Sequence, residues 1–422
     1  MADLELALSA ADAAVERLGP TLVEFLRRLV QCPSVSGSEQ AAQRLIAAEY
    51  RAMGLATDDL VSTRALLEGH PAFADDGIPF EDRINVVGRW PGLGGGRSLI
   101  LNGHMDVVPT GDPATWRHEP WGAEVADGRI YGRGACDMKA GLAAAAYAIR
   151  ALQSIGVQLR GDVLLESVIG EESGGIGTLT TIAQGYRADA CVIMEPTELD
   201  LCPVQSGALT FRITVRGRAA HACMKPSGVS AIEQFAPILV MLDRLNRERH
   251  ARHRHALYAD PTNIAPISVG TVRAGTWHST IPDCLVAEGR FGIFPREDAA
   301  AGRAELAEAL AAESAKHPWL AEHPPVLEWF EGQFESGETP TSSPIVRLVG
   351  DSHAGVAGER PGIRGITFGA DLRLFTRHAG IPTVMYGPGS ASVAHTTDEF
   401  VPIAEVVTCA KTLARTIVQW CA

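Results

Sequence analysis

Short apolar segments separated by helical stretches fill the chain from residue 85 onward. Strand-like runs lie at residues 85–88, 98–101, 163–168 and 190–194, and a helix-like stretch lies at residues 140–152. The same alternation resumes after residue 325 and closes with a long helix at residues 403–420. Strands that alternate with helices tend to pair in parallel, so the sequence predicts an α/β fold around a central, mainly parallel sheet.

The pattern changes between these two parts of the chain. Residues 208–215 alternate as a half-exposed strand, and a helix at 230–249, strands at 262–272 and 285–294 and a helix at 299–316 follow. A chain of 422 residues is long for one core. We therefore expect residues 1–203 and 325–422 to form one domain and residues 204–324 to form an inserted α+β domain.

Composition excludes some classes of partner. Lys and Arg number 37 and Asp and Glu number 50, which gives a net charge of −13. This balance argues against nucleic acid or an anionic membrane as the main partner. The sequence has no apolar stretch typical of a membrane helix. Its start is acidic, unlike a signal peptide, and its eight cysteines form no CxxC pairs. We therefore expect a cytoplasmic protein. The His-rich run ERHARHRHA, near residues 248–256, is interpreted as the solvated end of a helix.

Polar side chains stand where predicted strands end. In LILNGHMDVVP, His104 and Asp106 follow an apolar run and share one side of the chain. Strand ends are where open α/β sheets bind ligands. We expect the Asp106 carboxylate to accept the second ring N–H of His104, as partners of metal-binding histidines do. A polar turn without a ligand would give the same pattern.

Four further carboxylates and a second histidine occupy similar places. Asp137 follows the glycine-rich turn of YGRGACDMKAGLAA, where it either caps a helix or bridges two cations. Glu171 and Glu172 follow a strand in LLESVIGEESGG, and as neighbours they point in different directions, so one can bind metal while the other handles protons. Glu195 follows another strand in CVIMEPTELDL.

The second histidine is His395, in the late loop SVAHTTDEFVP. Acid or imidazole groups after so many strands or turns of one predicted sheet are difficult to explain by structure alone. Two histidines with three carboxylate ligands, one of them from the Glu171–Glu172 pair, suit Zn²⁺ or Co²⁺ better than cations that prefer thiols. The sequence therefore predicts a metal site.

The blocks GHMDVVP, GRGACDMKAG and GEESGG, in this order, resemble the family of acetylornithine deacetylase, succinyl-diaminopimelate desuccinylase, aminoacylase and glutamate carboxypeptidase. The resemblance covers nearly the whole chain. It implies a zinc-peptidase α/β domain with an inserted, ferredoxin-like lid domain that often dimerises. It also implies that Asp137 bridges two divalent ions, with His104 and Glu195 at one ion and Glu172 and His395 at the other.

The same resemblance assigns roles to other residues. Glu171 would be the general base, which takes a proton from water and passes it to the leaving amine, and Asp106 would orient His104. His221, in GRAAHACMKPSGVSAI, would reach the active site of a neighbouring subunit, although a histidine on a surface loop has the same local pattern.

Residues that bind substrate follow less directly from the resemblance. Asn263 and Arg290 lie near positions that hold a substrate carboxylate, although a lone Arg on a strand is more often solvated. Members of the family often read GGTSDAR where this chain has TFGADLRLF. This chain keeps Asp371 and Arg373, the latter a candidate for substrate binding, but its Gly-Thr element is altered. The sequence therefore does not identify the substrate.

The resulting hypothesis is a homodimeric, metal-dependent hydrolase that cleaves the amide bond of an N-acyl amino acid or a related small N-acylated amine. Its cofactors would be two divalent ions per subunit, Zn²⁺ with Co²⁺ as a substitute. A dipeptidase or carboxypeptidase on the same scaffold is the nearest alternative, and an inactive binding protein is another. A serine hydrolase is disfavoured because the sequence lacks a G-x-S-x-G motif.

Overall fold

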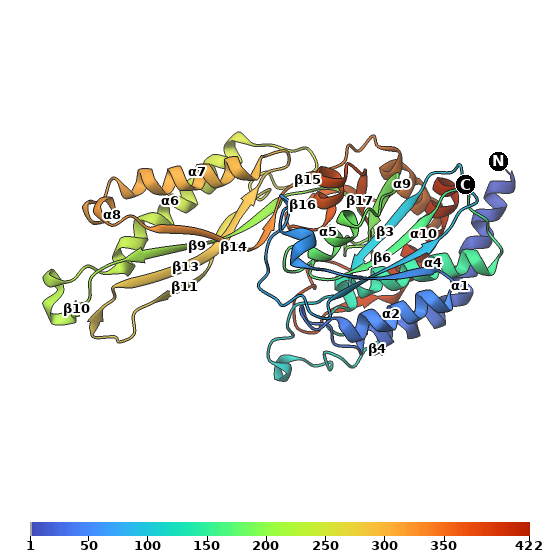
Figure 1. Ribbon diagram of the computed structural model, residues 1–422, viewed down its shortest axis with the longest axis horizontal. Helices are drawn as coiled ribbons and strands as arrows, with labels where there is room; N and C mark the ends of the chain where they lie inside the picture. Colours follow the sequence, from blue (N-terminus) through green and yellow to red (C-terminus); the bar gives the residue numbers. More distant parts are fainter. Residues whose placement is uncertain (1) are drawn as a thin grey trace.

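The computed structural model describes the backbone of residues 2–422 and the side chains from Leu4 onward. The molecule consists of a large body around a central sheet and a second, elongated domain that projects from it (Figure 1). The helices are α1 Ala2–Val30, α2 Gln40–Ala52, α3 Arg64–Leu67, α4 Ala140–Ser154, α5 Ile176–Ala183, α6 Ala231–Arg252, α7 Ala299–Ser314, α8 Pro318–Glu322, α9 Pro344–Ala357 and α10 Ile403–Cys421.

Besides these α-helices and four short 3-10 or π helices, the described part of the chain has eighteen strands. They are β1 Ala56–Val61, β2 Ile84–Trp90, β3 Leu99–His104, β4 Glu124–Ala126, β5 Arg129–Tyr131, β6 Val163–Val168, β7 Ala190–Ile193, β8 Leu201–Gln205, β9 Gly207–Arg216, β10 Ala220–His221, β11 Ile267–Ala274, β12 Thr280–Ile281, β13 Cys284–Ile293, β14 Val326–Phe334, β15 Gly337–Glu338, β16 Ile363–Ile366, β17 Thr383–Met385 and β18 Phe400–Pro402.

The central sheet has the strand order β1-β2-β6-β3-β7-β17-β8-β15, with β16 paired to β8. The inner strands β6, β3, β7 and β17 pair in parallel, whereas β1 and β2 add antiparallel at one edge. Every residue of β3, β6 and β7 is buried, as expected for parallel strands covered on both faces. The predicted α/β fold is therefore confirmed.

Helices α1, α4, α9 and α10 pack on one another beside this sheet. The small residues of α4 allow the helix to approach the sheet closely, because a Cβ at Gly141 would lie only 2.3 Å from the carbonyl oxygen of Met194. Helices α1 and α10 lie at the end of the molecule away from the second domain (Figure 1). None of the helices within residues 2–422 is both long and apolar enough to span a bilayer.

The second domain is an antiparallel sheet of order β11-β13-β9-β14, with α6 and α7 packed beside it (Figure 1). Its main elements follow the order β9-α6-β11-β13-α7-β14, which is the ferredoxin-like βαββαβ arrangement. Strand β9 alternates buried and partly exposed residues along its length, in agreement with the alternation in its sequence. A separate hydrophobic cluster, which includes Phe211, Leu242 and Leu306, forms the core of this domain.

The bounds of the second domain differ from the expected 204–324. Val204 lies in β8 of the central sheet, whereas β14 pairs with β9 and so extends the second sheet to Phe334. Pro324 and Pro325, at the expected end of the domain, instead precede an edge strand, a position that tolerates proline.

Helix α1 continues through Pro20, and strand β1 follows α2. The expected strand at 262–272 begins only at Ile267, in β11.

The His-rich run at the end of α6 is solvated only in part, because Glu248, Arg252 and Arg254 are exposed as expected whereas two of its residues are buried. Arg249 is fully buried and its guanidinium contacts the carboxylates of Glu297 at 2.6 Å and Glu305 at 2.9 Å. His250 is also buried, and its Nε2 accepts the N–H of Ile264 at 3.1 Å. The acidic partners lie about fifty residues away in sequence, so the local charge pattern could not reveal the burial.

Candidate metal centre

The carboxyl ends of three neighbouring parallel strands supply most of the site. His104 is the last residue of β3, Glu171 and Glu172 follow β6, and Glu195 follows β7. Because β6, β3 and β7 are adjacent and parallel, their carboxyl ends meet at one edge of the sheet. Within the described residues, two sets of side chains have ligand atoms close enough to hold a metal ion, and we call them metal-type groups. One is His104 with Glu171 and Glu195, and the other is His104 with Asp137 and Glu172.

Asp137 lies between the two histidines. Its Oδ1 is 3.1 Å from His104 Nε2, and its Oδ2 is 3.4 Å from His395 Nε2. The His395 ring also contacts Glu172 Oε1 at 2.9 Å, and Glu195 Oε2 lies 4.0 Å from His104 Nε2. The structure thus brings together all five residues that the sequence predicts as metal ligands, and each oxygen of Asp137 faces a different histidine.

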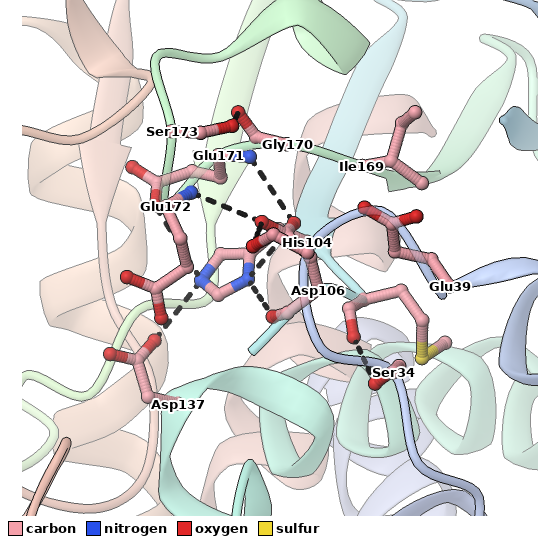
Figure 2. Close-up of polar contacts among 12 residues, drawn as sticks. Ser34, Glu39, His104, Asp106, Asp137, Ile169, Gly170, Glu171, Glu172 and Ser173 are labelled. Atoms are coloured by element: carbon pink, nitrogen blue, oxygen red, sulfur yellow. Dashed lines mark hydrogen bonds and ion pairs between the residues drawn. The ribbon is translucent and has the colours of Figure 1, made fainter. Parts of the chain in front are cut away.

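Asp106 acts differently from our expectation. His104 Nδ1 lies 2.8 Å from the backbone carbonyl oxygen of Asp106, whereas the Asp106 carboxylate is 3.7 Å away (Figure 2). That carboxylate instead accepts the backbone N–H groups of Glu171 and Glu172, both at 3.2 Å, and the hydroxyl of Ser36 at 3.1 Å. The chain turns after β3 so that the carbonyl, rather than the side chain, faces the ring. Asp106 therefore orients His104 through its backbone and holds the two glutamates through its carboxylate.

Burial and mutual repulsion dominate the electrostatics of the cluster. Burial raises the pKa of Glu195 well above its usual value, and the charge on Asp137 adds to the effect. Burial also raises the pKa of Glu171 well above its usual value, although the charge on His104 opposes this. The hydrogen bonds to Asp137 and Glu172 raise the pKa of His395 to about 10. Each of these shifts reflects negative charge concentrated in a buried place.

A cluster of this kind fits divalent cations. Several buried carboxylates in contact are costly unless cations neutralise them. Glu171 Oε1 is buried and has no hydrogen-bond partner among the described residues. The donors are imidazole nitrogens and carboxylate oxygens without a thiolate, which is the set that Zn²⁺ and Co²⁺ accept.

A pocket opens beside the cluster. Acidic groups and His395 line one side, and the other lining residues are Pro196, Phe368, Gly369, Ala391 and Ala394. Gly369 is required for the packing of this wall, because a Cβ there would lie 2.4 Å from the ring of Phe334 at the end of β14. The altered loop TFGADLRLF thus supplies an aromatic ring and a tightly packed glycine to the pocket.

The other predicted site residues lie outside this pocket in a single chain. His221 is exposed on β10, at the far end of the second domain (Figure 1), and Asn263 is exposed before β11. Arg290 on β13 donates from Nη2 to the carbonyl oxygen of Thr367. Arg373 is fully buried, and its Nη2 donates to the Gly174 carbonyl at 2.8 Å, so it supports the loop behind Glu172.

Sequence reasoning missed Glu399. This residue is fully buried on the His395 loop, and its Oε1 accepts the backbone N–H groups of Cys136 at 2.9 Å and Asp137 at 3.1 Å. We gave weight to acids that follow strands, whereas Glu399 precedes one, β18. The pocket residues Phe368, Ala391 and Ala394 were also missed, since apolar side chains in loops carry no chemical signal.

Comparison with known proteins identifies the family. Residues 100–419 match the model of peptidase family M20/M25/M40. The chain belongs to this family. It is therefore an M20 metallohydrolase with a candidate His/Glu/Asp metal site.

Two curated relatives of this M20 protein are similar over most of their length. N-formyl-4-amino-5-aminomethyl-2-methylpyrimidine deformylase from Halalkalibacterium halodurans is 32% identical over 346 residues, which cover 77% of this chain and 79% of that protein. Acetylornithine deacetylase from Myxococcus xanthus is 28% identical over 348 residues, which cover 81% and 85%.

Among solved structures, an M20 family metallo-carboxypeptidase from Sulfolobus solfataricus superposes with a TM-score of 0.75 at 18% identity. The superposition covers 95% of this chain and 98% of the carboxypeptidase chain. At this level of identity the likeness concerns the fold alone.

A buried acid in this M20 protein lies outside the metal cluster. Glu166 on β6 is fully buried, and its Oε2 accepts hydrogen bonds from Asn102 at 2.9 Å and Thr181 at 3.3 Å. Its Oε1 has no partner within the described part of the chain. Burial raises the pKa of Glu166 from 4.5 to about 7, and the negative charge of Asp371 contributes to the increase.

We therefore expect Glu166 to make folding stability depend on pH. Because its folded pKa lies above the unfolded value, stability falls as pH rises from about 4.5 through about 7. Glu166→Gln should remove this fall. The unfolding free energy of the variant minus that of wild type should therefore be about 2 kcal/mol larger at pH ~8 than at pH ~5. Urea unfolding at several pH values measures the difference. The exposed Glu322→Gln is the control, and identical pH profiles for all three proteins would exclude the effect.

Proposed function

We propose that this protein is a metal-dependent amide hydrolase that removes a small acyl group from an N-acylated amine or amino acid. The observation that supports it most is the position of Asp137, whose two carboxylate oxygens face His104 and His395. A carboxylate placed between two imidazoles can bridge a pair of cations, with one oxygen toward each. Glu171 lies beside this arrangement, with Oε2 at 3.9 Å from His104 Nε2.

The two cation sites would share Asp137. His104 and Glu195 would complete one site, and Glu172 and His395 would complete the other. When bound, two divalent cations, Zn²⁺ or Co²⁺ in its place, would polarise the amide carbonyl and lower the pKa of a water molecule. The residues of the chain hold these groups in place, and Asp106 fixes Glu171 and Glu172 through their backbone N–H groups.

Glu171 would carry the proton. Its Oε1 has no hydrogen-bond partner among the described residues, and its side chain lines the pocket. Burial favours the protonated carboxyl, so Glu171 is suited to accept a proton from water and to hold it. It would then donate the proton to the nitrogen of the leaving amine as the amide bond breaks.

Glu171→Gln tests this role. The substitution keeps the size of the side chain but removes its ability to accept and return a proton. We expect bound metal to remain at the wild-type amount, while kcat falls by about 10² to 10⁴-fold. Metal content by atomic spectroscopy and initial rates are the measurements. Near-normal turnover by the purified variant would show that another group is the base.

The pocket favours a small, uncharged acyl group such as formyl or acetyl. Within the described residues, no Lys or Arg lines it, and its remaining wall consists of Pro196, Phe368, Gly369, Ala391 and Ala394. A succinyl carboxylate would lack a cationic partner in this wall. Relatives named deformylase and acetylornithine deacetylase agree with this choice, whereas relatives named succinyl-diaminopimelate desuccinylase act on a succinyl group, so the choice rests on the pocket wall. A dipeptidase or carboxypeptidase activity remains the alternative, since solved structures with those activities share the fold.

A substrate panel distinguishes these functions. N-formyl, N-acetyl and N-succinyl forms of one amine and a set of dipeptides are assayed in parallel on protein loaded with Zn²⁺ or Co²⁺. We expect turnover of the formyl or acetyl compounds to exceed that of the succinyl compound and the dipeptides. A chelator should abolish the activity, and added Zn²⁺ or Co²⁺ should restore it. Preferred cleavage of dipeptides would contradict the deacylase proposal, and activity after verified metal removal would contradict the metal mechanism.

We also propose that two copies of the chain pair through the second domain. Strand β11 is an edge of its sheet, and large apolar side chains are exposed on it, on the loop that follows it and on α6 beside it. These exposed residues are Ile232, Leu239, Val240, Val272 and Trp277. An unpaired edge with exposed apolar neighbours is typical of an interface. His221 is remote from the metal cluster of its own chain, so pairing is what would let it reach the site of the partner.

Sedimentation tests the pairing. We expect wild-type protein to sediment as a dimer at micromolar concentration, and Val240→Glu to sediment as a monomer because it places a charge in the apolar contact. Glu308→Gln, on α7 of the same domain, serves as the control. A monomeric wild-type protein would contradict the proposal.

A further inference from the structure

The loops that carry Asp137 and His395 meet at one buried carboxylate. Glu399 belongs to the His395 loop, yet its Oε1 accepts the N–H of Cys136 at 2.9 Å and the N–H of Asp137 at 3.1 Å. A backbone hydrogen bond joins the same two segments, because the N–H of Gly132 donates to the carbonyl oxygen of Glu399 at 2.8 Å. The contact therefore joins two segments that lie more than 250 residues apart in sequence.

The backbone at Asp137 needs such an acceptor. Asp137 has φ −116° and ψ 100°, outside the helical region, so the segment before α4 does not form regular helical hydrogen bonds there. A buried N–H without an acceptor costs free energy. An ionised carboxylate is a stronger acceptor than a neutral group, so Glu399 fixes this irregular backbone more firmly than water or an amide would.

Arg133 fixes the other oxygen of Glu399. Its Nη1 lies 2.5 Å from Glu399 Oε2, its Nη2 donates to the Pro109 carbonyl at 3.4 Å, and its guanidinium lies 5.2 Å from the ring centre of Trp116. The side chains of Arg133 and Glu399 are 3% and 0% exposed, so neither is free to turn toward solvent. Both oxygens of Glu399 are thus committed to protein partners, and neither belongs to the metal-type groups found in the described residues.

We propose that Glu399 is a positioning residue that sets the spacing between Asp137 and His395, the two groups that would share the second cation. The inference rests on the proposed function, since it concerns the same metal centre. Glu399 holds Asp137 by the backbone, so the carboxylate of Asp137 stays free to face both histidines. It holds His395 through the continuity of its own loop. Loss of the contact would leave the His104 side in place and loosen the site of Glu172 and His395.

Two variants of Glu399 separate position from charge. Glu399→Gln removes the charge and places an amide N–H₂ against either Arg133 or the backbone N–H groups. Glu399→Asp keeps the charge but shortens the arm by one methylene. Glu405→Gln is the matched control, because Glu405 holds the other end of the His395 loop by accepting the Gly389 N–H at 2.8 Å without contact to Asp137.

Zn²⁺ alone is titrated into chelator-treated full-length protein, and the number and affinity of bound ions are measured by calorimetry. The visible absorption of bound Co²⁺ gives a second readout. We expect wild type and Glu405→Gln to bind two Zn²⁺ ions. Both Glu399 variants should bind one ion normally and the second about 10- to 100-fold more weakly, with an altered Co²⁺ spectrum.

The outcomes separate the inference from the proposed function. Normal binding by Glu399→Asp with weak binding by Glu399→Gln would show that charge, rather than position, matters, and would overturn the inference. Lower melting temperatures with two ions still tightly bound and an unchanged Co²⁺ spectrum would show a merely structural role and overturn it too. If Glu399→Gln fails to fold, Glu399→Asp decides alone. Wild-type protein that binds fewer than two ions would overturn the proposed metal centre itself, and this inference with it.

Discussion

Four carboxylates meet two imidazole rings at one buried edge of the central sheet, and this concentration of like charge is what the surrounding structure must hold. Without structural constraints or cations, such groups would move apart or take up protons. The raised pKa values of Glu171 and Glu195 reflect the tendency to take up protons. The parallel strands β6, β3 and β7 prevent separation because their register brings their ends together. The fold thus imposes a charge density that cations would relieve.

The supports of the site act mainly on the backbone. Asp106 accepts the N–H groups of Glu171 and Glu172, and its carbonyl oxygen faces the His104 ring. Glu399 accepts the N–H groups of Cys136 and Asp137. Because main-chain contacts fix the position, the side-chain oxygens and nitrogens of the cluster keep their lone pairs for one another and for cations. The backbone is thus held rigidly, while the side-chain atoms that would bind cations are not used to hold it.

The sequence alone could predict the parts of this arrangement that have a local signal. His104, Glu171 and Glu195 follow apolar strands directly, so their convergence follows from the α/β pattern. The partner of Asp106 could not be predicted, since the choice between its carbonyl and its carboxylate depends on the turn after β3. Glu399 was missed because its contact with Asp137 is long-range.

The same reasons apply to the fold. The central sheet and α4 were expected from local periodicity, whereas β14 was assigned to the wrong domain. Its partner β9 lies more than a hundred residues earlier, and only that pairing shows where the strand belongs. The burial of Arg249 depends in the same way on Glu297 and Glu305, which are remote in sequence. Long-range pairing is thus the information that local patterns lack.

The contact between Gly369 and Phe334 links the two domains of the protein at the pocket itself. Phe334 ends the last strand of the ferredoxin-like sheet, and Gly369 is the neighbour of Phe368 in the pocket wall. A change in the orientation of the second domain would therefore also move this wall. The shape of the pocket thus depends on how the two domains pack together and not on the metal cluster alone.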